Sequence, residues 1–538
     1  MLPTPDSGSA LSFLRHLLLT VSVTMTFALA APAWTSAGLP ESAPDEPQVP
    51  ATANTVVVLG DSITKGVRTG VAADEIFSAR LEAALRKYGL NVVINNQGIG
   101  GERTDQALGR LSKDILSQKP VLVVVMYGTN DSYVDIGKSD SRISADEFES
   151  NLREIVQQLQ SQETKVILMT EPRWGDNAGK NGAGEHPNLR LERYLERTRM
   201  VAESEKLPLI DHYQLWSEAR SRGENISQWM TDECHPNPEG HRQLTESMLP
   251  VIQKTLMDLP ARFEPTSSNP IFTAAEGKWD SRIRERGWIL REDGLWKLWY
   301  TGYQADSSPM MMKLGYATSK DGIHWERAGS EPLIGDFWVE DMMIVKKDNT
   351  YFMFAEGAQD QAQLLKSMDG VVWERVGTLD VRLKNGQPIP PGPYGTPVGY
   401  FENGQWYLFY ERRDLGVWLA TSTDMKVWTN ISDDPVIPRD ESGVDSVMMA
   451  LNQIIKVGDE YVAVLHGTVD PMKPRRWCTY LARSKDLIHW KKEAPLRPVE
   501  ENKSSGQLIH DGNQWLLYTM HDRVDLHTPV SESQDSPK

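Results

Sequence analysis

The sequence predicts two structural domains: a three-layer α/β domain with a parallel sheet, followed by an all-β five-bladed propeller. The first prediction rests on short apolar runs that alternate with helical patterns between residues 55 and 260. The second rests on an aromatic strand pattern that occurs five times after residue 270 at nearly constant spacing, starting at positions 296, 351, 406, 461 and 515. A chain of 538 residues is also too long for one ordinary core.

The composition excludes several classes of protein. Charged residues make up 24% and hydrophobic residues 40%, the balance of a soluble globular protein. The net charge of -17 argues against a nucleic-acid partner, which needs a basic face. Only two cysteines occur, Cys234 and Cys478, so neither a disulfide framework nor a thiolate zinc site is expected.

The segment 1–30 has the pattern of an export signal. The apolar run at 17–30 is short for a bilayer span and is followed by small residues suited to cleavage. The alternative is an uncleaved N-terminal anchor. Residues 31–54 are rich in Ala, Pro, Ser and Glu and are predicted to be a flexible linker. We therefore expect an exported protein, periplasmic or extracellular, with no stable membrane insertion after cleavage.

The α/β domain is predicted over residues 55–260. Buried strands alternating with helices indicate a parallel sheet covered on both faces. Strands are predicted at 56–59, 92–94, 121–126 and 166–169. Helices are predicted at 79–88, 148–160 and 189–206, and from His235 to about residue 259.

The propeller is predicted over residues 271–525, with 526–538 as a disordered tail. Thirteen of the 17 tryptophans lie in this half and are interpreted as core between blades. A turn containing Asp, Asn or Gly precedes each copy of the repeated strand, as a hairpin requires. The strand copies are 296–300, 351–354, 406–410, 461–464 and 515–518. A second element, Ser-x-Asp-x-x-x-Trp, recurs at 319–325, 367–373, 422–428 and 484–490.

Four short blocks in the first domain contain chemically useful side chains. Each alone has an ordinary explanation, such as a helix cap, a turn glycine, a turn asparagine or a polar surface loop. Together they supply a serine, oxyanion donors and an Asp-His pair, which are what an ester hydrolase needs. The blocks are 60–64 (Gly-Asp-Ser-Ile-Thr), 96–101 (Asn-Gln-Gly-Ile-Gly-Gly), 128–131 (Gly-Thr-Asn-Asp) and 232–235 (Asp-Glu-Cys-His).

The spacing of the blocks suggests how they would work together. Ser62 follows a strand and should open a helix at the edge of the sheet where ligands bind. Asp232 and His235, at positions i and i+3, can lie on one side of a turn, with the aspartate holding the imidazole. His241 is read as a helix residue outside this group.

Two further residues are candidate oxyanion donors. The backbone N–H of Gly101 could donate to a developing oxyanion, with Gly98 as an alternative in the same loop. The side-chain amide of Asn130 could be another donor.

The four blocks resemble those of the SGNH, or GDSL-type, hydrolases over residues 55–260. The resemblance implies a flavodoxin-like sheet and an esterase that needs no metal or organic cofactor. It implies Ser62 as nucleophile, His235 as general base and acid, and Asp232 as the residue that orients the histidine. The oxyanion hole would consist of the Ser62 N–H, the Gly101 N–H and the Asn130 side chain. One departure is Gly100-Gly101, where many relatives carry Ser-Gly.

The repeats resemble the five-bladed propellers of arabinanase- and fructosidase-like glycoside hydrolases, most clearly at 315–325. Such enzymes carry acids on the inner strands of successive blades, and glycoside hydrolysis needs two carboxyl groups. Asp280 and Asp341 could form the pair, or Glu411 could substitute, but 394–397 lacks the glutamate of the relatives. A sugar-binding or degenerate domain is favoured over a second enzyme.

A sugar site in the propeller would use charged residues at the central funnel. Blade position points to Asp280, Arg282, Arg284 and Asp341. The alternative is that these acids hold loops.

The combined prediction is an exported serine esterase that removes O-acetyl or other short acyl groups from carbohydrate, with a glycan-binding propeller. Its partner would be an acylated carbohydrate or polysaccharide. Three alternatives stay open: a lipid esterase or lysophospholipase, a bifunctional esterase and glycosidase, and a non-catalytic glycan-binding protein. The sequence leaves open the glycan, the acyl group, the oligomeric state and the domain orientation.

Overall fold

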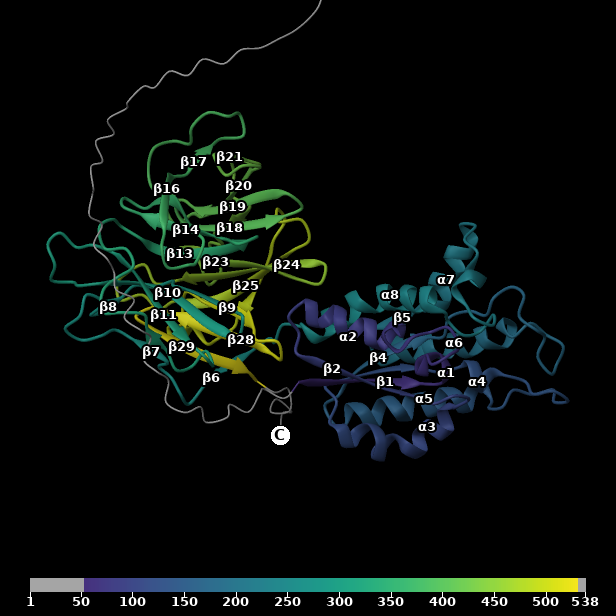
Figure 1. Ribbon diagram of the computed structural model, residues 1–538. Coiled ribbons are helices and arrows are strands. Elements are labelled where there is room, and N and C mark those ends of the chain that lie inside the picture. Colours follow the sequence, from purple (N-terminus) through teal and green to yellow (C-terminus); the bar gives the residue numbers. More distant parts are fainter. Residues whose placement is uncertain (1–52, 531–538) are drawn as a thin grey trace, which may run out of the picture. The chain divides into compact units, whose positions relative to one another are not determined.

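The structure is a computed structural model that describes residues 53–530. The predicted signal peptide at 1–30, the predicted linker up to residue 52 and residues 531–538 of the predicted tail lie outside the described residues. No helix within residues 53–530 is both long and apolar enough to cross a membrane. The described chain contains an α/β domain followed by an all-β domain, as predicted (Figure 1).

The α/β domain is built on one parallel sheet in the order β2-β1-β3-β4-β5, a flavodoxin-like order. The four predicted strands are all present. The fifth, β5, is very short and has no recognisable apolar run in the sequence. The strands are β1 (Asn54–Gly60), β2 (Val92–Gly98), β3 (Leu122–Met126), β4 (Lys165–Thr170) and β5 (Leu209–Asp211).

Helices cover both faces of this sheet and make the three layers (Figure 1). In β1, Val56 and Val58 point into one core, and Val57 and Leu59 point into the other. The first core is closed by α2 (Phe77–Lys87), α7 (His212–Ser221) and α8 (Pro238–Leu256). The second is closed by α3 (Thr104–Arg110), α5 (Ala145–Gln160) and α6 (Asn188–Ser204).

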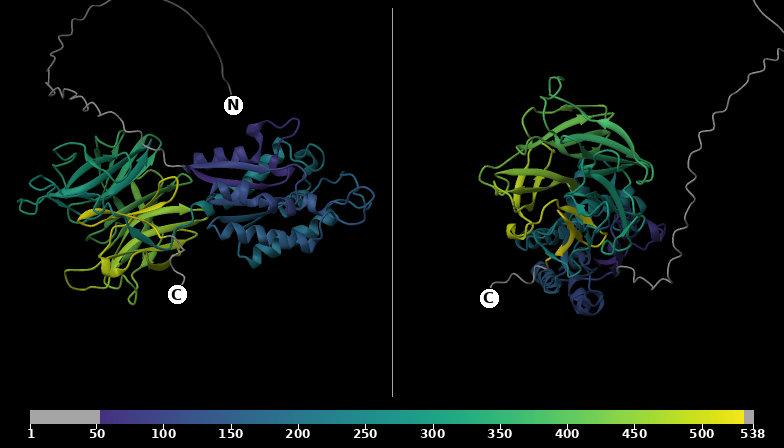
Figure 2. Two further views of the ribbon diagram at one scale, coloured as in Figure 1. Left: turned by 90° about the horizontal axis from the view of Figure 1, so that it is seen from below. Right: turned by 90° about the vertical axis from the view of Figure 1, so that its left-hand side faces the viewer.

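The all-β domain consists of five sheets arranged as the blades of a propeller (Figures 1 and 2). Pairing within the blades is antiparallel except between β17 and β21. Blade 1 contains β8 (Arg282–Ile283), β9 (Trp288–Glu292), β10 (Leu295–Tyr303), β11 (Lys313–Ser319) and β12 (Glu326–Arg327). Blade 2 contains β13 (Glu340–Lys347), β14 (Thr350–Gly357), β15 (Gln361–Ser367) and β16 (Glu374–Thr378).

Blades 3 and 4 follow the same plan, and around the centre β18 of blade 3 contacts both β13 of blade 2 and β23 of blade 4. Blade 3 contains β17 (Asp380–Arg382), β18 (Gly395–Glu402), β19 (Gln405–Glu411), β20 (Gly416–Ser422), β21 (Val427–Asn430) and β22 (Ile437–Pro438). Blade 4 contains β23 (Met448–Val457), β24 (Glu460–Thr468), β25 (Cys478–Ser484) and β26 (Lys491–Pro495).

The two sequence repeats have distinct structural roles. The repeated aromatic strand is the one that pairs with β9, β13, β18, β23 or β27 in its blade, and the five copies are β10, β14, β19, β24 and β28 (Trp515–Met520). The Ser-x-Asp element is a turn in which the Ser367 hydroxyl accepts from the Gly370 N–H at 2.9 Å. The buried Trp299 indole of blade 1 donates to Gly370 O of blade 2 at 2.7 Å, so this tryptophan is part of the core between blades.

Blade 5 is closed by strands from both ends of the domain. It combines β27 (Gln507–His510), β28 and β29 (Arg523–Pro529) with β6 (Phe263–Pro265) and β7 (Phe272–Thr273). The propeller therefore starts before residue 271, and β29 continues to Pro529, into the segment predicted as a tail. The repeat pattern marks the aromatic strands, so it could not reveal a pairing between distant chain ends.

Candidate active site

The candidate site lies where the order of the parallel sheet reverses. From β1 the chain passes to β2 on one side, and from β3 it passes to β4 on the other. Ligands of open α/β sheets bind at the carboxyl edge at such a point. Ser62 follows β1 and opens the short helix α1 (Ser62–Lys65), while Asn130 follows β3 in α4 (Thr129–Ser132).

A close approach of α1 to the sheet fixes the position of Ser62. A Cβ atom on Gly60 would lie 2.1 Å from Thr64 Oγ1 and 2.6 Å from Met126 O. The Asp61 side chain caps α1 by accepting from the Ile63 N–H at 2.8 Å. Glycine is thus required before the acid-serine pair.

Ser62, His235 and Asp232 form one hydrogen-bonded chain. Ser62 Oγ lies 2.9 Å from His235 Nε2, and His235 Nδ1 lies 2.9 Å from both carboxylate oxygens of Asp232. Because a carboxylate can only accept, Nδ1 carries the hydrogen and the Nε2 lone pair is directed at the serine hydroxyl. The serine and the Asp-His pair stand in two distant blocks of the sequence, and the structure brings them together.

The turn that carries Asp232 and His235 is anchored at several points. The Thr231 N–H donates to His235 O at 2.8 Å, and the His235 N–H donates to Asp232 Oδ1 at 2.8 Å. Glu233 has a left-handed φ of 62°. Its carboxylate accepts from Ser227 Oγ at 2.9 Å. The side chains of Asp232 and His235 therefore project from a braced turn.

The surroundings of the hydrogen-bonded series Ser62–His235–Asp232 favour a neutral His235 beside a charged Asp232. Burial lowers the pKa of His235 below its usual range, and the nearby Arg68 adds to this against the opposing effect of Asp232. Partial burial acts to raise the pKa of Asp232, but hydrogen bonds from the backbone and ring of His235 outweigh it, and the net shift is downward. Neutral His235 is the form able to accept a proton.

The glycines of the second block are not equivalent. A Cβ on Gly98 would lie 2.1 Å from Lys65 N, so this residue packs against α1. A Cβ on Gly100 would lie 4.0 Å from Ser62 Cβ, which puts the loop beside the serine. Gly101 has φ of +80° and open space around its Cβ position. Gly101 thus has the room that a substrate needs.

Asn130 is held from both ends of its amide. Nδ2 donates to Asp61 Oδ2 at 2.6 Å, and Oδ1 accepts from Arg142 Nη1 at 3.1 Å. These partners fix which atom of the amide is nitrogen. One N–H of the group is bonded to Asp61, and the second is the one that an oxyanion could use.

Two arginines at the site were not identified from the sequence. A guanidinium nitrogen of Arg68 contacts His235 Nε2, the atom that also faces Ser62. Arg142 braces Asn130. Single arginines in loops carry no pattern that sequence reading could use. His241 lies within α8, fully buried and packed against Phe77, outside the chain formed with Ser62.

The predicted propeller residues separate into different environments. Asp280 is 1% exposed, and its carboxylate accepts from Tyr300 OH at 2.9 Å and from Arg327 Nε at 2.7 Å. Asp280 is therefore bonded to two residues of blade 1, and the structure does not show it paired with Asp341. Arg282 is exposed on β8. Arg284 donates to Glu340 at 3.0 Å.

Four non-glycine residues with left-handed backbone occupy matching places in four blades. Each lies within or just before one of the strands β9, β13, β18 and β27, and all four are buried. Neighbouring members of the set are separated along the chain by one or two lengths of the sequence repeat. Arg286 Nη1, Asp341 Oδ1 and Ser505 Oγ find no protein partner there. Strained backbone and unpaired polar atoms gather at binding sites. The four residues are Arg286 (φ 57°), Asp341 (φ 47°), Thr396 (φ 45°) and Ser505 (φ 50°).

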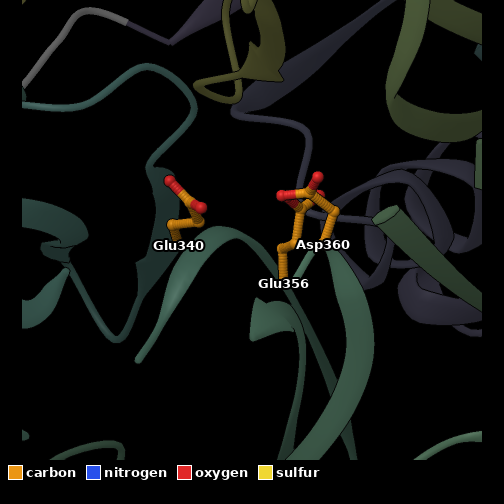
Figure 3. Close-up of side chains that lie close together, drawn as sticks. All are labelled: Glu340, Glu356 and Asp360. Atoms are coloured by element: carbon orange, nitrogen blue, oxygen red, sulfur yellow. The ribbon is translucent and has the colours of Figure 1, made fainter. Parts of the chain in front are cut away.

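Three more carboxylates lie beside Asp341. Ligand oxygens of Glu340, Glu356 and Asp360 lie within 4.8 Å of one another (Figure 3). Burial raises the pKa of Glu356 well above its usual range, and the charge of Asp341 adds to this. Carboxylate oxygens in this arrangement can accept hydrogen bonds from the hydroxyl groups of a sugar, or can coordinate a divalent cation such as Ca²⁺ or Mg²⁺. The sequence reading did not identify this cluster, because Glu356 and Asp360 lie on the second strand and its turn.

Known proteins match both parts of the chain. Residues 58–243 match the GDSL-like lipase/acylhydrolase family. The uncharacterized lipoprotein YqeF of Bacillus subtilis is 30% identical over 30% of this chain and 72% of its own length. An acetylxylan esterase of Geobacillus stearothermophilus is 26% identical over 36% of this chain and 91% of the esterase. A 1,2-beta-oligomannan phosphorylase of Thermoanaerobacter sp. is 27% identical over 48% of this chain and 94% of the phosphorylase.

The last relative fits a glycoside hydrolase-like propeller, and the others fit the α/β domain. The resemblance drawn from the four sequence blocks is therefore confirmed. The chain belongs to the GDSL-like lipase/acylhydrolase family and is a carboxylic ester hydrolase that also carries a five-bladed propeller.

Proposed function

We propose that Ser62 is the nucleophile of this esterase, with His235 as its base and Asp232 as the group that orients the histidine. The observation that carries the proposal is the unbroken chain from Ser62 Oγ through His235 to Asp232. Ser62 Oγ attacks the ester carbonyl while Nε2 takes its proton. The tetrahedral intermediate collapses, and His235 returns the proton to the departing alcohol.

The second half of the reaction repeats this sequence with water. His235 removes a proton from water, the hydroxide attacks the acyl-Ser62 ester, and the acid leaves as Ser62 regains its proton. The proposed oxyanion donors are the N–H groups of Ser62 and Gly101 and the Nδ2 of Asn130. A fixed donor of this kind contributes about 3–4 kcal/mol in well-studied hydrolases.

The proposed substrate is an O-acetyl or other short acyl group on carbohydrate. Support comes from the acetylxylan esterase relative and from the presence of a sugar-enzyme-like propeller in the same chain. A lipid esterase is the alternative, and a series of acyl chain lengths separates the two. A carbohydrate deacetylase should prefer acetyl, whereas a lipid esterase should prefer long chains.

For the propeller we propose glycan binding at the centre of the blades, through Arg284, Arg286 and Asp341. The unpaired buried polar atoms and the strained backbone support a ligand there. Glycoside cleavage is a second candidate, favoured by the phosphorylase relative and by the buried carboxyl of Asp341. Loss of aryl-glycoside cleavage in Asp341→Asn, with unchanged esterase activity, would support it.

The N-terminal segment 1–30 keeps its proposed role as export signal and 31–54 its role as linker, except that Asn54 is already the first residue of β1; the hydrolase domain is proposed at 55–260. Export would place the enzyme where polysaccharides occur. The uncharacterized lipoprotein among its relatives is compatible with this location.

The test of the proposed function is acetate release from acetylated oligosaccharides and from an aryl acetate. Ser62→Ala should lose both activities, while Ser161→Ala, which removes an exposed hydroxyl at the end of α5, should keep both. Equal activity in Ser62→Ala and the wild type would overturn the assignment of the nucleophile. Release from the aryl acetate alone would overturn the carbohydrate substrate.

A further inference from the structure

Three fully buried carboxyl side chains lie directly behind the proposed nucleophile. Asp61, Asp131 and Glu171 are each 0% exposed, and they follow the adjacent strands β1, β3 and β4. Buried acids are normally neutralised by a cation, as Glu102 is by Arg110 at 2.6 Å. The neighbours of these three carboxyls are instead neutral hydrogen-bond donors or one another.

The hydrogen bonds of Asp61 and Asp131 come from neutral groups. Asp61 accepts from the Ile63 N–H at 2.8 Å and from Asn130 Nδ2 at 2.6 Å. Asp131 accepts from the N–H and hydroxyl of Thr104, at 2.9 and 2.7 Å. Both carboxyls are thus arranged as acceptors.

Glu171 differs from both, because neither of its oxygens receives a donor from any other residue of the described chain. Its polar neighbour is the carboxyl of Asp61, which interacts with it directly. An ionised Glu171 would be a fully buried charge with no donor and no cation beside a second carboxyl, so one of the two must carry a proton. Since Asp61 already accepts from two N–H groups, the proton belongs on Glu171.

The surroundings of Glu171 favour the neutral acid. Burial raises the pKa of Glu171 well above its ordinary value, and the neighbouring Asp61 and Asp131 raise it further. The buried Cys234 thiol and Tyr127 phenol also lie near the pair, and neither is a cation.

We propose that Glu171 is a positioning residue that stays protonated and donates its O–H to Asp61, thereby fixing Asn130 and the start of α1 around Ser62. The proposal rests on the assignment of Asn130 to the oxyanion hole. One negative charge on Asp61 then receives three donors: the Glu171 O–H, the Ile63 N–H and the Asn130 amide. Ionised Glu171 would put a second charge in this space and push Asp61 away from Asn130.

Two variants separate the donor role of Glu171 from its packing role. Glu171→Gln keeps the shape and an N–H donor but cannot ionise, whereas Glu171→Leu keeps most of the volume without a donor. We expect Glu171→Gln to retain kcat within about threefold and Glu171→Leu to lose roughly 10- to 100-fold in kcat with little change in KM. At alkaline pH the wild type should lose activity before Glu171→Gln does.

Infrared spectroscopy tests the proton itself without any turnover. The difference spectrum of wild type minus Glu171→Gln should contain the C=O stretching band of a protonated carboxylic acid. The matched spectrum for Glu102→Gln, a buried glutamate paired with Arg110, should lack that band. Absence of the band for Glu171, or equal kcat in Glu171→Leu and Glu171→Gln, would overturn the proposal. Full activity of Ser62→Ala would instead overturn the proposed function on which it rests.

Discussion

Arg68 is the residue around the proposed triad that makes the most direct contact with His235. Its guanidinium contacts His235 Nε2, and its charge lowers the pKa of the imidazole. In the proposed mechanism, Arg68 must move away from His235 Nε2 when that atom takes the proton of Ser62.

The pH dependence of the esterase should report this contact. Because the pKa of His235 is lowered, the acid limb of kcat/KM should have its midpoint below pH 6.5, the ordinary histidine value. Arg68→Ala removes a nearby positive charge, so the pKa of His235 should rise and the limb should move to higher pH. The measurement is hydrolysis of an aryl acetate from pH 4 to 9. Arg86→Ala, on the exposed side of α2, is the control and should leave the limb in place.

At the scale of single elements, the Ser-x-Asp turns stabilise the blades by satisfying backbone donors. Asp369 Oδ1 accepts from the N–H groups of both Val371 and Val372 at 2.8 Å. This is the arrangement of a helix N-cap applied to a turn. Its recurrence in four blades explains why the sequence keeps the motif although the residues are partly exposed.

Replacing Asp369 by alanine should therefore lower the free energy of unfolding by about 0.5–2 kcal/mol, the usual range for losing a cap. Denaturant unfolding followed by tryptophan fluorescence measures the change. Glu374→Ala removes an exposed partner of Lys366 on the neighbouring strand and should cost less than about 0.5 kcal/mol. Equal losses in the two variants would mean that the turn bonds contribute nothing specific.

For the whole molecule, the sequence predicted the architecture well where local pattern and fold agree. Four of the five α/β strands, the helices α2, α5, α6 and α8, and the repeated aromatic strand of each blade were recognisable from periodicity and repeat spacing, whereas β5, α3 and α7 were not. Contacts between distant segments were not, because no local signal encodes them. Examples are the β6–β29 closure of blade 5, the bond from Asn130 to Asp61, and the burial of Asp280 between Tyr300 and Arg327.

The stability of the whole protein should also depend on its buried acids. Burial, aided by Asp414, raises the pKa of Glu411 to about 8, from an ordinary value of 4.5. Between these pH values the folded state holds a proton that the unfolded state has lost, so the free energy of unfolding falls as pH rises. Glu411→Gln removes this slope.

The expected outcome is that the thermal midpoint of Glu411→Gln improves relative to wild type between pH 5 and pH 8.5. Differential scanning calorimetry at both pH values checks it. Glu374→Gln, a change at an exposed residue, is the control, and its thermal midpoint should change with pH by the same amount as that of the wild type. If the thermal midpoint of Glu411→Gln also changes with pH by the same amount as that of the wild type, Glu411 is ionised in the folded protein.

The most direct test of the central claim is covalent labelling of the nucleophile with an aryl phosphonate ester, read by mass spectrometry. The phosphonate phosphorus resembles the tetrahedral intermediate, so the chain from Ser62 to Asp232 predicts one adduct per molecule, on the peptide containing Ser62, with loss of activity in step. Ser62→Ala should take up no label, and His235→Ala should react far more slowly. Labelling of another residue, or activity that survives complete labelling of Ser62, would contradict the account.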